Sequence, residues 1–244
     1  MINPVAFTLL GFEVRWYGIC IAVGFLLAST IALKRAPLAE IDKNDLLDII
    51  LFIIPFGIIG ARIYYIIFQW DYYKNFPGDI LKIRNGGLAI HGGIILGFIT
   101  AFIASKHKKI NFLKLCDLLF PTIALAQAIG RWGNFFNHEA YGSHTNLPWA
   151  IKINGDTVHP TFLYESIWCF LIFIFLSFLM KNKTFDGQIA CLYGILYSLE
   201  RFFVESFRTD SLMIFSFKQA QIISIIIIIF SLIMYFILKD RSKL

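Results

Sequence analysis

The most restrictive feature of this sequence is a long apolar run near its end, residues 222–238, which reads IISIIIIIFSLIMYFIL. It contains no charged residue and is long enough to cross the hydrocarbon core of a bilayer, which takes about 17–25 residues. Six further stretches have a similar length and character. We therefore predict membrane-spanning helices at about residues 16–33, 46–69, 88–105, 112–130, 161–180, 188–207 and 218–238.

The composition agrees with several membrane spans. The 244 residues are 58% hydrophobic and 16% charged, whereas soluble domains are about 45–50% apolar and about 25% charged. No internal repeat of the kind found in inverted-repeat transporters is visible. The expected fold class is an all-α polytopic membrane protein of about seven transmembrane helices, which form a single membrane-embedded domain over residues 1–244.

The distribution of Lys and Arg predicts the orientation of the chain. The short connections at 34–45, 106–111 and 181–187 and the C-terminal tail are denser in basic residues than the longer connections, which include Arg84. Because cytoplasmic loops carry an excess of Lys and Arg, we expect the N-terminus outside and the C-terminus in the cytoplasm. With a net charge of +6, such a protein is expected to meet anionic membrane lipids and no nucleic acid.

The longest connection, residues 131–160, is predicted to be a polar loop on the outer face. Within it, WAIKINGDTVHP (149–160) suggests a small hairpin. Asn154 and Gly155 suit a tight type I′ turn, in which both central residues need a positive φ. The first residues of the chain lack a basic segment followed by a small-residue cleavage site, so no cleaved signal peptide is expected.

Alternation of the spans brings most conspicuous polar residues to one face, whichever side that face is on. Ionisable groups inside a span are costly and indicate function by default. For a single arginine, snorkelling to the interface is an equally good explanation, but a group of arginines, a histidine and glutamates on one face favours a site. The residues on this face are Tyr17, Arg62, His91, Arg131 to Gly142, His159, Tyr164, Glu165, Arg201, Glu205 and Arg208; Asp48, Lys114 and Asp117 lie near the other face.

Two spans show local patterns. Arg201, Glu205 and Arg208 are spaced i, i+4 and i+7, so they are expected to share one helical face on which the carboxylate holds a guanidinium. The alternative is a structural ion pair that ties helices together. His91 lies in GGLAIHGGIILG (86–97), where Gly on both sides lets another backbone or a substrate approach closely. Gly93 and Gly97 also form a GxxxG pattern, which favours helix packing.

Several kinds of catalytic site are excluded. HEAYG (138–142) lacks the second histidine of a zinc-binding HExxH motif, and there is no GxSxG nucleophile, phosphate-binding loop or dinucleotide fingerprint. The four cysteines lie in apolar stretches without a CxxC pair, which favours buried structural thiols. The remaining set is arginines, amides and a histidine at a membrane face. Guanidinium groups suit phosphate, so chemistry alone suggests a phospholipid substrate, and a histidine could accept a proton.

The segment GRWGNFFNHEAYG (130–142) resembles the signature of bacterial prolipoprotein diacylglyceryl transferases. The resemblance covers nearly the whole chain, with RWYG (15–18), IIGARIYY (58–65), GGLAIHGG (86–93), HPTFLYE (159–165) and RFFVESFRTD (201–210) in matching order. Two positions depart from the family pattern: Phe162 stands where Gln is frequent, and Ala220 where Gly is expected. Both departures leave the arginines in place.

The resemblance implies a reaction. A diacylglyceryl group moves from phosphatidylglycerol to the lipobox cysteine of a prolipoprotein, a thioether forms, and glycerol phosphate leaves. The implied partners are phosphatidylglycerol and the prolipoprotein signal peptide, with no metal or other cofactor. The implied location is the bacterial cytoplasmic (inner) membrane, with the active site toward the outer face.

The resemblance also implies roles for matching residues. Arg131 is expected to bind the lipid phosphate, and Arg201, oriented by Glu205, to stabilise the departing phosphate. His91 is expected either to help deprotonate the thiol or to position the headgroup. The other expected substrate-binding residues are Tyr17, Asn134 and Asn137 as hydrogen-bond partners, Glu139 orienting Arg131 or the loop, Gly142 allowing a tight turn, Arg62 and Arg208.

Two other functions fit parts of the pattern. A transporter or flippase for an anionic lipid or small anion would also use several spans and intramembrane arginines. It is disfavoured because no repeat is visible and because the polar residues gather at one face, whereas transporter sites usually lie near the midplane. A purely structural assembly partner is disfavoured by the same one-sided cluster.

Overall fold

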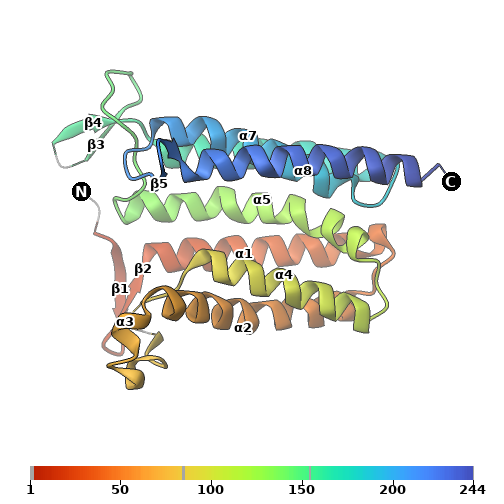
Figure 1. Cartoon of the computed structure of the whole chain (residues 1–244), viewed down its shortest axis with the longest axis horizontal. Helices are drawn as coiled ribbons and strands as arrows, with labels where there is room; N and C mark the ends of the chain where they lie inside the picture. Colours follow the sequence, from red (N-terminus) through yellow and green to blue (C-terminus); the bar gives the residue numbers. More distant parts are fainter. Residues whose placement is uncertain (1–2, 84–85, 154, 244) are drawn as a thin grey trace. The chain divides into compact units, whose positions relative to one another are not determined.

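The computed structural model describes residues 3–83, 86–153 and 155–243 (Figure 1). Its long helices are α1 (Trp16–Arg35), α2 (Lys43–Phe68), α4 (Ile90–His107), α5 (Phe112–Phe136), α6 (Thr161–Leu179), α7 (Gln188–Phe207) and α8 (Gln219–Arg241). Shorter helical elements are α3 (Trp70–Tyr73), η1 (Ala36–Ala39), η2 (Pro77–Asp79) and η4 (Met180–Asn182). The strands pair as antiparallel hairpins: β1 (Val5–Leu9) with β2 (Phe12–Arg15), β3 (Ile151–Ile153) with β4 (Asp156–Val158), and β5 (Met213–Ile214) with β6 (Phe217–Lys218).

Each predicted span coincides with one long helix, which confirms the all-α polytopic fold class. Among the described residues, 6 helices are long and apolar enough to cross a membrane. The predicted span at 188–207 is α7, which has 20 residues but is too polar to be among them, since its C-terminal half carries Glu200, Arg201 and Glu205. The orientation of the chain in the membrane stays a prediction.

The largest difference from the predicted boundaries is at the end of α5. The helix continues to Phe136, so the first six residues of the 131–160 segment are helical and not loop. Aromatic packing against α6 explains this: the rings of Trp132 and Phe135 lie 5.4 Å and 4.9 Å from that of Phe162. The indole of Trp132 also donates to the hydroxyl of Ser166 at 3.2 Å. Phe162, one of the two departures from the family pattern, is therefore part of this packing.

The chain divides into two compact units, which we describe separately. The first unit runs to Arg35 and resumes at Cys116; it contains α1, nearly all of α5, helices α6 to α8 and the hairpins. The second unit, Ala36–Leu115, contains α2, α3 and α4. The expectation of a single domain over the whole chain stays a prediction.

The core of the first unit lies where α5, α6 and α7 meet. Ala124, Ile172, Leu176 and Ile189 are buried there, at 0–3% exposure. The backbones of α1 and α5 approach closely at Gly24, where a Cβ would lie 2.9 Å from the Ala126 carbonyl oxygen of α5. A larger residue at this position would therefore clash. This apolar core holds α5 and α7, which carry Arg131 and Arg201, against α6, which carries Glu165.

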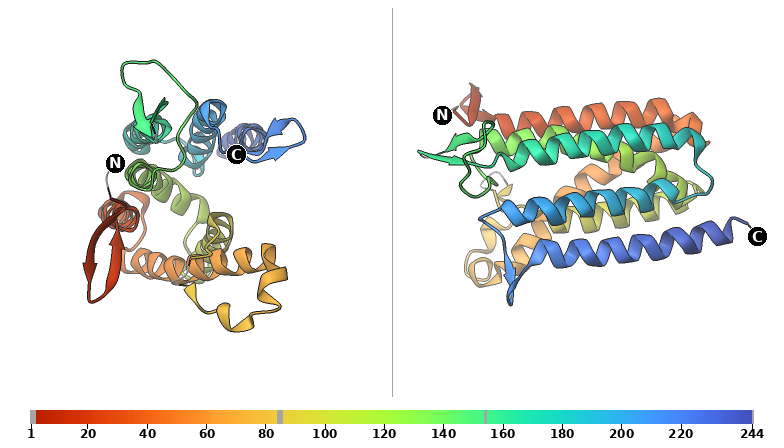
Figure 2. Two further views of the ribbon diagram at one scale, coloured as in Figure 1. Left: turned by 90° about the vertical axis from the view of Figure 1, so that its left-hand side faces the viewer. Right: turned by 90° about the horizontal axis from the view of Figure 1, so that it is seen from above.

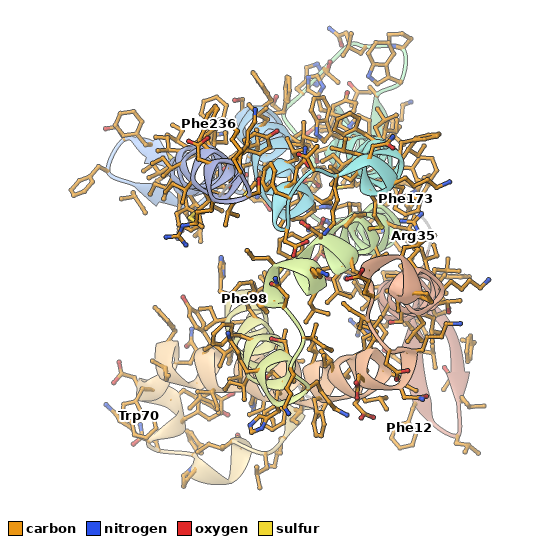
Figure 3. All side chains as sticks on the ribbon, turned by 90° about the vertical axis from the view of Figure 1, so that its right-hand side faces the viewer. Phe12, Arg35, Trp70, Phe98, Phe173 and Phe236 are labelled. Atoms are coloured by element: carbon orange, nitrogen blue, oxygen red, sulfur yellow. The ribbon has the colours of Figure 1, made fainter. Side chains whose placement is uncertain are left out.

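Polar residues at the start of α5 and the end of α1 have structural partners. Asp117 accepts hydrogen bonds from the amides of Gly187 (2.8 Å) and Ala190 (3.0 Å) at the beginning of α7, and from the Lys183 ammonium (3.0 Å). It therefore caps α7, since the first amides of a helix have no partner within it. Arg35 lies over the Phe173 ring, 5.3 Å from its centroid (Figure 3).

In the second unit, α2 and α4 cross at glycines. A Cβ on Gly60 would lie 2.4 Å from the Gly92 carbonyl oxygen, and one on Gly92 would lie 2.2 Å from the Gly60 carbonyl oxygen. The flanking glycines of His91 thus allow a backbone approach, as the sequence suggested. Of the predicted GxxxG pair, Gly93 takes part, whereas a Cβ on Gly97 would meet only the side chain of Ile53, at 3.7 Å.

The hairpins of the first unit gather at one end of its helices, opposite the C-terminus (Figures 1 and 2). The predicted hairpin within 149–160 is confirmed, with Ile151 opposite Val158 and Ile153 opposite Asp156. Gly155 has a φ of +94°, as the predicted turn requires, but Asn154 lies outside the described residues. Arg84, one of the basic residues on which the predicted orientation depends, also lies outside them.

Candidate active site

Arg131 lies in the last turns of α5, and its guanidinium contacts both α6 and α7. Nη1 lies 3.1 Å from Oε2 of Glu165, and Nη2 donates to the Tyr197 hydroxyl at 3.3 Å. The side chain is only 18% exposed. Arg131 is thus a largely buried cation fixed by two neighbouring helices.

Glu165 of α6 joins Arg131 to Arg201. Its Oε1 accepts a hydrogen bond from Nη1 of Arg201 at 2.8 Å, while its Oε2 faces Arg131. The Glu165 side chain is 0% exposed. Because one carboxylate lies between two guanidiniums, two positive charges from different helices are held side by side.

Arg201 has a second carboxylate partner on its own helix. Its Nη2 lies 2.7 Å from Oε2 of Glu205, four residues along α7, and Glu205 is almost fully buried. The predicted pairing of these two residues is confirmed. Arg201 also forms an ion pair with Glu165 of α6, which joins α7 to α6. Both predicted kinds of ion pair, one within a helix and one between helices, are therefore present at Arg201.

Arg208 differs from its predicted position. α7 ends at Phe207, and Arg208 has extended backbone (φ −73°, ψ 142°), so it does not continue the helical face of Arg201 and Glu205. Its Nε and Nη2 donate to the two oxygens of Asp210 at 3.0 Å and 2.8 Å. The hydrogen bond from the Arg208 guanidinium lowers the pKa of the Asp210 carboxyl. The seven-residue spacing failed because the helix stops one residue too early.

Lys218 holds the end of α7 next to this site. Its ammonium donates to the carbonyls of Glu205 (2.6 Å), Arg208 (2.8 Å) and Ser206 (3.3 Å). The last carbonyls of a helix have no partner within it, and a cation there is favourable. The sequence assigned no role to Lys218.

Tyr17 and the amides of the signature lie around the end of α5. The ring of Tyr17 packs on Gly133, where a Cβ would lie 2.7 Å from Cδ2. Asn134 lies one residue further along α5, and its carbonyl accepts the Glu139 amide at 3.1 Å. Oδ1 of Asn137 is buried and has no hydrogen-bond partner among the described residues. An unsatisfied buried acceptor of this kind is rare in folded proteins and indicates a missing partner.

Glu139 is not the carboxylate that pairs with Arg131, since that partner is Glu165. Its other predicted role, orienting the loop, stays a prediction. Gly142 is needed for a close approach: a Cβ there would lie 2.7 Å from Cβ of His159 and 3.1 Å from the Phe207 carbonyl oxygen. Its amide donates to the His159 carbonyl at 2.9 Å. A side chain at this position is therefore blocked, as predicted.

His91 and Arg62 belong to the second unit. His91 is exposed in the first turn of α4, with its ring 6.0 Å from that of Tyr64. Arg62 is 7% exposed and donates to four backbone carbonyls at 2.6–2.9 Å, those of Asp79, Ile80, Gly86 and Gly87. This geometry supports a role for Arg62 in holding the loop that precedes α4. Direct contact of either residue with a substrate stays a prediction.

Sequence reasoning placed Glu165 on the correct face but gave it no role, and it missed Glu200. Glu200 of α7 is 2% exposed, and neither of its carboxylate oxygens has a hydrogen-bond partner among the described residues. The available signal was the same for both, an ionisable residue within a predicted membrane span. The guanidiniums of Arg131 and Arg201, held in place by carboxylates, form an arrangement suited to an anionic group such as phosphate.

Comparison with known proteins identifies the family. A family model described as prolipoprotein diacylglyceryl transferase matches residues 4–237. A protein from Finegoldia magna is 53% identical over 233 residues, which cover 95% of this chain and 94% of the relative. One from Clostridioides difficile is 51% identical over 241 residues, covering 99% and 97%. Both relatives are named phosphatidylglycerol–prolipoprotein diacylglyceryl transferase. The chain therefore belongs to the prolipoprotein diacylglyceryl transferase family.

Proposed function

We propose that this multi-pass membrane protein transfers the diacylglyceryl group of phosphatidylglycerol to the lipobox cysteine of a prolipoprotein. The products are a thioether-linked lipid and glycerol phosphate, and the reaction is the first step of lipoprotein maturation. The observation that carries the proposal is the pair of guanidiniums, Arg131 and Arg201, held on one buried carboxylate. The names of relatives about half identical over nearly the full length support the same reaction.

The chemistry explains why two fixed arginines are useful. The cysteine sulfur forms a bond to the terminal glyceryl carbon, and the bond from that carbon to the phosphate oxygen breaks. The electron pair leaves on the oxygen, where negative charge grows. Guanidiniums already held in place stabilise this charge more in the transition state than in the ground state. Arg131 binds the lipid phosphate, and Arg201, oriented by Glu205, stabilises the departing oxygen.

The thiol must also lose its proton, because the thiolate is the nucleophile. His91 is the candidate acceptor, with headgroup positioning as its alternative role. Tyr17, Asn134 and Asn137 provide hydrogen bonds to the headgroup or to the peptide. The buried, unpartnered Oδ1 of Asn137 supports this, since it lacks a donor that a substrate would supply.

The location follows from the same reasoning. The six long apolar helices found among the described residues indicate a multi-pass membrane protein. The distribution of Lys and Arg supports a site at the outer face of the bacterial cytoplasmic membrane. Both substrates are anchored in that membrane. The transporter alternative loses support because the relatives are named as transferases.

The first test uses purified protein, phosphatidylglycerol and a synthetic lipobox peptide, with the product read by mass spectrometry. The wild type should add one diacylglyceryl mass to the cysteine. Arg131→Ala should lower the rate by about 10²–10³-fold, as when one group that stabilises an oxyanion is removed. Arg241→Ala, which removes an exposed arginine in the last turn of α8, is the matched control and should keep the wild-type rate.

Each outcome has a clear meaning. A well-folded wild type that makes no modified peptide would refute the transferase and favour transport of an anionic lipid. If Arg131→Ala keeps both wild-type turnover and wild-type affinity for phosphatidylglycerol, the phosphate-binding role of Arg131 is refuted while the reaction stands.

A further inference from the structure

Glu200 is a buried carboxylate that no step of the proposed reaction uses. It lies on α7 directly before Arg201, is 2% exposed, and neither oxygen accepts a hydrogen bond within the described part of the chain. Burying an unpaired charge is expensive, and more so within a membrane. A position of this kind needs a compensating charge, a proton or a function.

The groups around Glu200 come from three helices. Arg131 of α5 and Glu165 and Cys169 of α6 interact electrostatically with Glu200. So do Tyr197 and Arg201 of α7 itself, and Arg208, which follows the end of α7. Lys218, which precedes α8, adds an ammonium at the end of α7, where it donates to the carbonyls of Glu205 and Arg208. Arg208 is likewise engaged by both oxygens of Asp210.

The remaining charges balance when every group is ionised. Three cations, those of Arg131, Arg201 and Lys218, accompany three carboxylates, those of Glu165, Glu205 and Glu200. Glu165 and Glu205 each have a guanidinium within 3.1 Å. Glu200 has no partner among the described residues, so it is the carboxylate that can take up a proton without breaking an ion pair.

A bound phosphate upsets this balance. A phosphodiester carries one negative charge, and it would bind to guanidiniums that two carboxylates already neutralise. A third buried negative charge beside it would oppose binding, because Coulomb repulsion is strong where water is excluded. A neutral Glu200 removes that repulsion.

We propose that Glu200 is a positioning residue that takes up a proton when the phosphate of phosphatidylglycerol binds to Arg131 and Arg201. The inference rests on the proposed role of these arginines. It predicts that lipid affinity depends on pH through a residue that does not touch the lipid. Affinity should fall as the pH rises, since a proton must be taken up for binding.

The test measures binding of phosphatidylglycerol to the full-length protein in nanodiscs of a zwitterionic lipid, without peptide, so that thiol chemistry plays no part. In the wild type, Kd should rise with pH, by up to about tenfold per pH unit over the range where the proton is taken up. Glu200→Gln, which copies the protonated acid, should bind as tightly as the wild type at low pH and should lose most of this dependence. Glu13→Gln, at the exposed Glu13 of β2, is the control and should keep it.

The outcomes separate the possibilities. If Glu200→Gln keeps the wild-type pH dependence, the proposal is wrong. It is also wrong if this variant binds at least tenfold more weakly at every pH with an unchanged melting temperature, because the carboxylate would then act as a fixed charge. Binding calorimetry on the wild type, in buffers of different ionisation enthalpy, needs no variant: uptake of a proton supports the proposal and no uptake overturns it. If Arg131→Ala retains lipid affinity, the failure lies instead in the proposed phosphate site.

Discussion

Glu165 contacts Arg131 of α5 and Arg201 of α7 from a position with no exposed surface. Removing one member of a buried ion pair leaves an uncompensated charge, which costs about 3–5 kcal/mol. Here two guanidiniums share the carboxylate, so both would lose their fixed positions. The orientation of the two arginines thus depends on a residue that need not touch the substrate.

Replacing Glu165 with Gln tests this dependence. We expect Glu165→Gln to lower the melting temperature and to lower the transfer rate by at least about tenfold, because misplaced catalytic groups are costly. The measurements are thermal unfolding in detergent and the mass-spectrometric transfer assay. Glu13→Gln again serves as the control, and a Glu165→Gln protein with wild-type stability and rate would show that the shared carboxylate is dispensable.

At the residue scale, the sequence predicts pairs within one helix better than pairs between helices. The four-residue spacing of Arg201 and Glu205 was sufficient, because both lie on α7. The pairing of Arg131 with Glu165 depends on how α5 packs against α6, which no local spacing encodes. For Arg208 the spacing was misleading, because it assumed that the helix continues to Arg208, whereas α7 ends at Phe207.

At the element scale, the sequence predicted each long helix but misplaced the end of α5. Gly130, Gly133 and the polar residues around them resemble a loop, since glycine is unfavourable within helices. The structure keeps them helical because Trp132 and Phe135 pack against Phe162, about thirty residues further along the chain. Tertiary packing thus overrides a local preference, and as a result Arg131 lies on a helix.

The crossing of α2 and α4 gives a prediction with a control in the same helix. Gly60→Ala would place Cβ 2.4 Å from the Gly92 carbonyl oxygen, so the helices must separate, at a cost of about 1–3 kcal/mol. Gly57→Ala places Cβ 3.7 Å from the Gly93 carbonyl oxygen, an ordinary contact, and should be neutral or slightly stabilising. Thermal unfolding of both variants measures the difference. Equal melting temperatures would show that the crossing does not need close backbone contact.

At the scale of the whole molecule, the outer surface agrees with a lipid environment. On α8 alone, Ile226, Phe230 and Phe236 are about 60% exposed. Phe236 is labelled in Figure 3. Water would oppose such exposure, whereas hydrocarbon does not. The hydropathy of the sequence was sufficient to predict this, because a membrane span is a property of composition over a whole segment.

Orientation is the whole-molecule prediction that remains to be tested. Phe215 at the tip of the β5–β6 hairpin is 97% exposed, and Ser242 follows α8 at the opposite end. In intact cells, a membrane-impermeant maleimide should label Phe215→Cys and leave Ser242→Cys unlabelled until the membrane is opened. The parent protein with its native cysteines gives the background. The reverse pattern would place the arginine cluster on the cytoplasmic side.

The shared carboxylate also has a consequence for the order in which the protein is made. Arg131 is synthesised before any of its partners, and Glu165 follows with the next helix, so these two charges can neutralise each other while the rest of the chain is still on the ribosome. Arg201 then joins a pair that already exists. Insertion of α5 and α6 as a hairpin would spare the membrane two isolated charges, and ribosome-bound chains that end before α7 should already contain that pair.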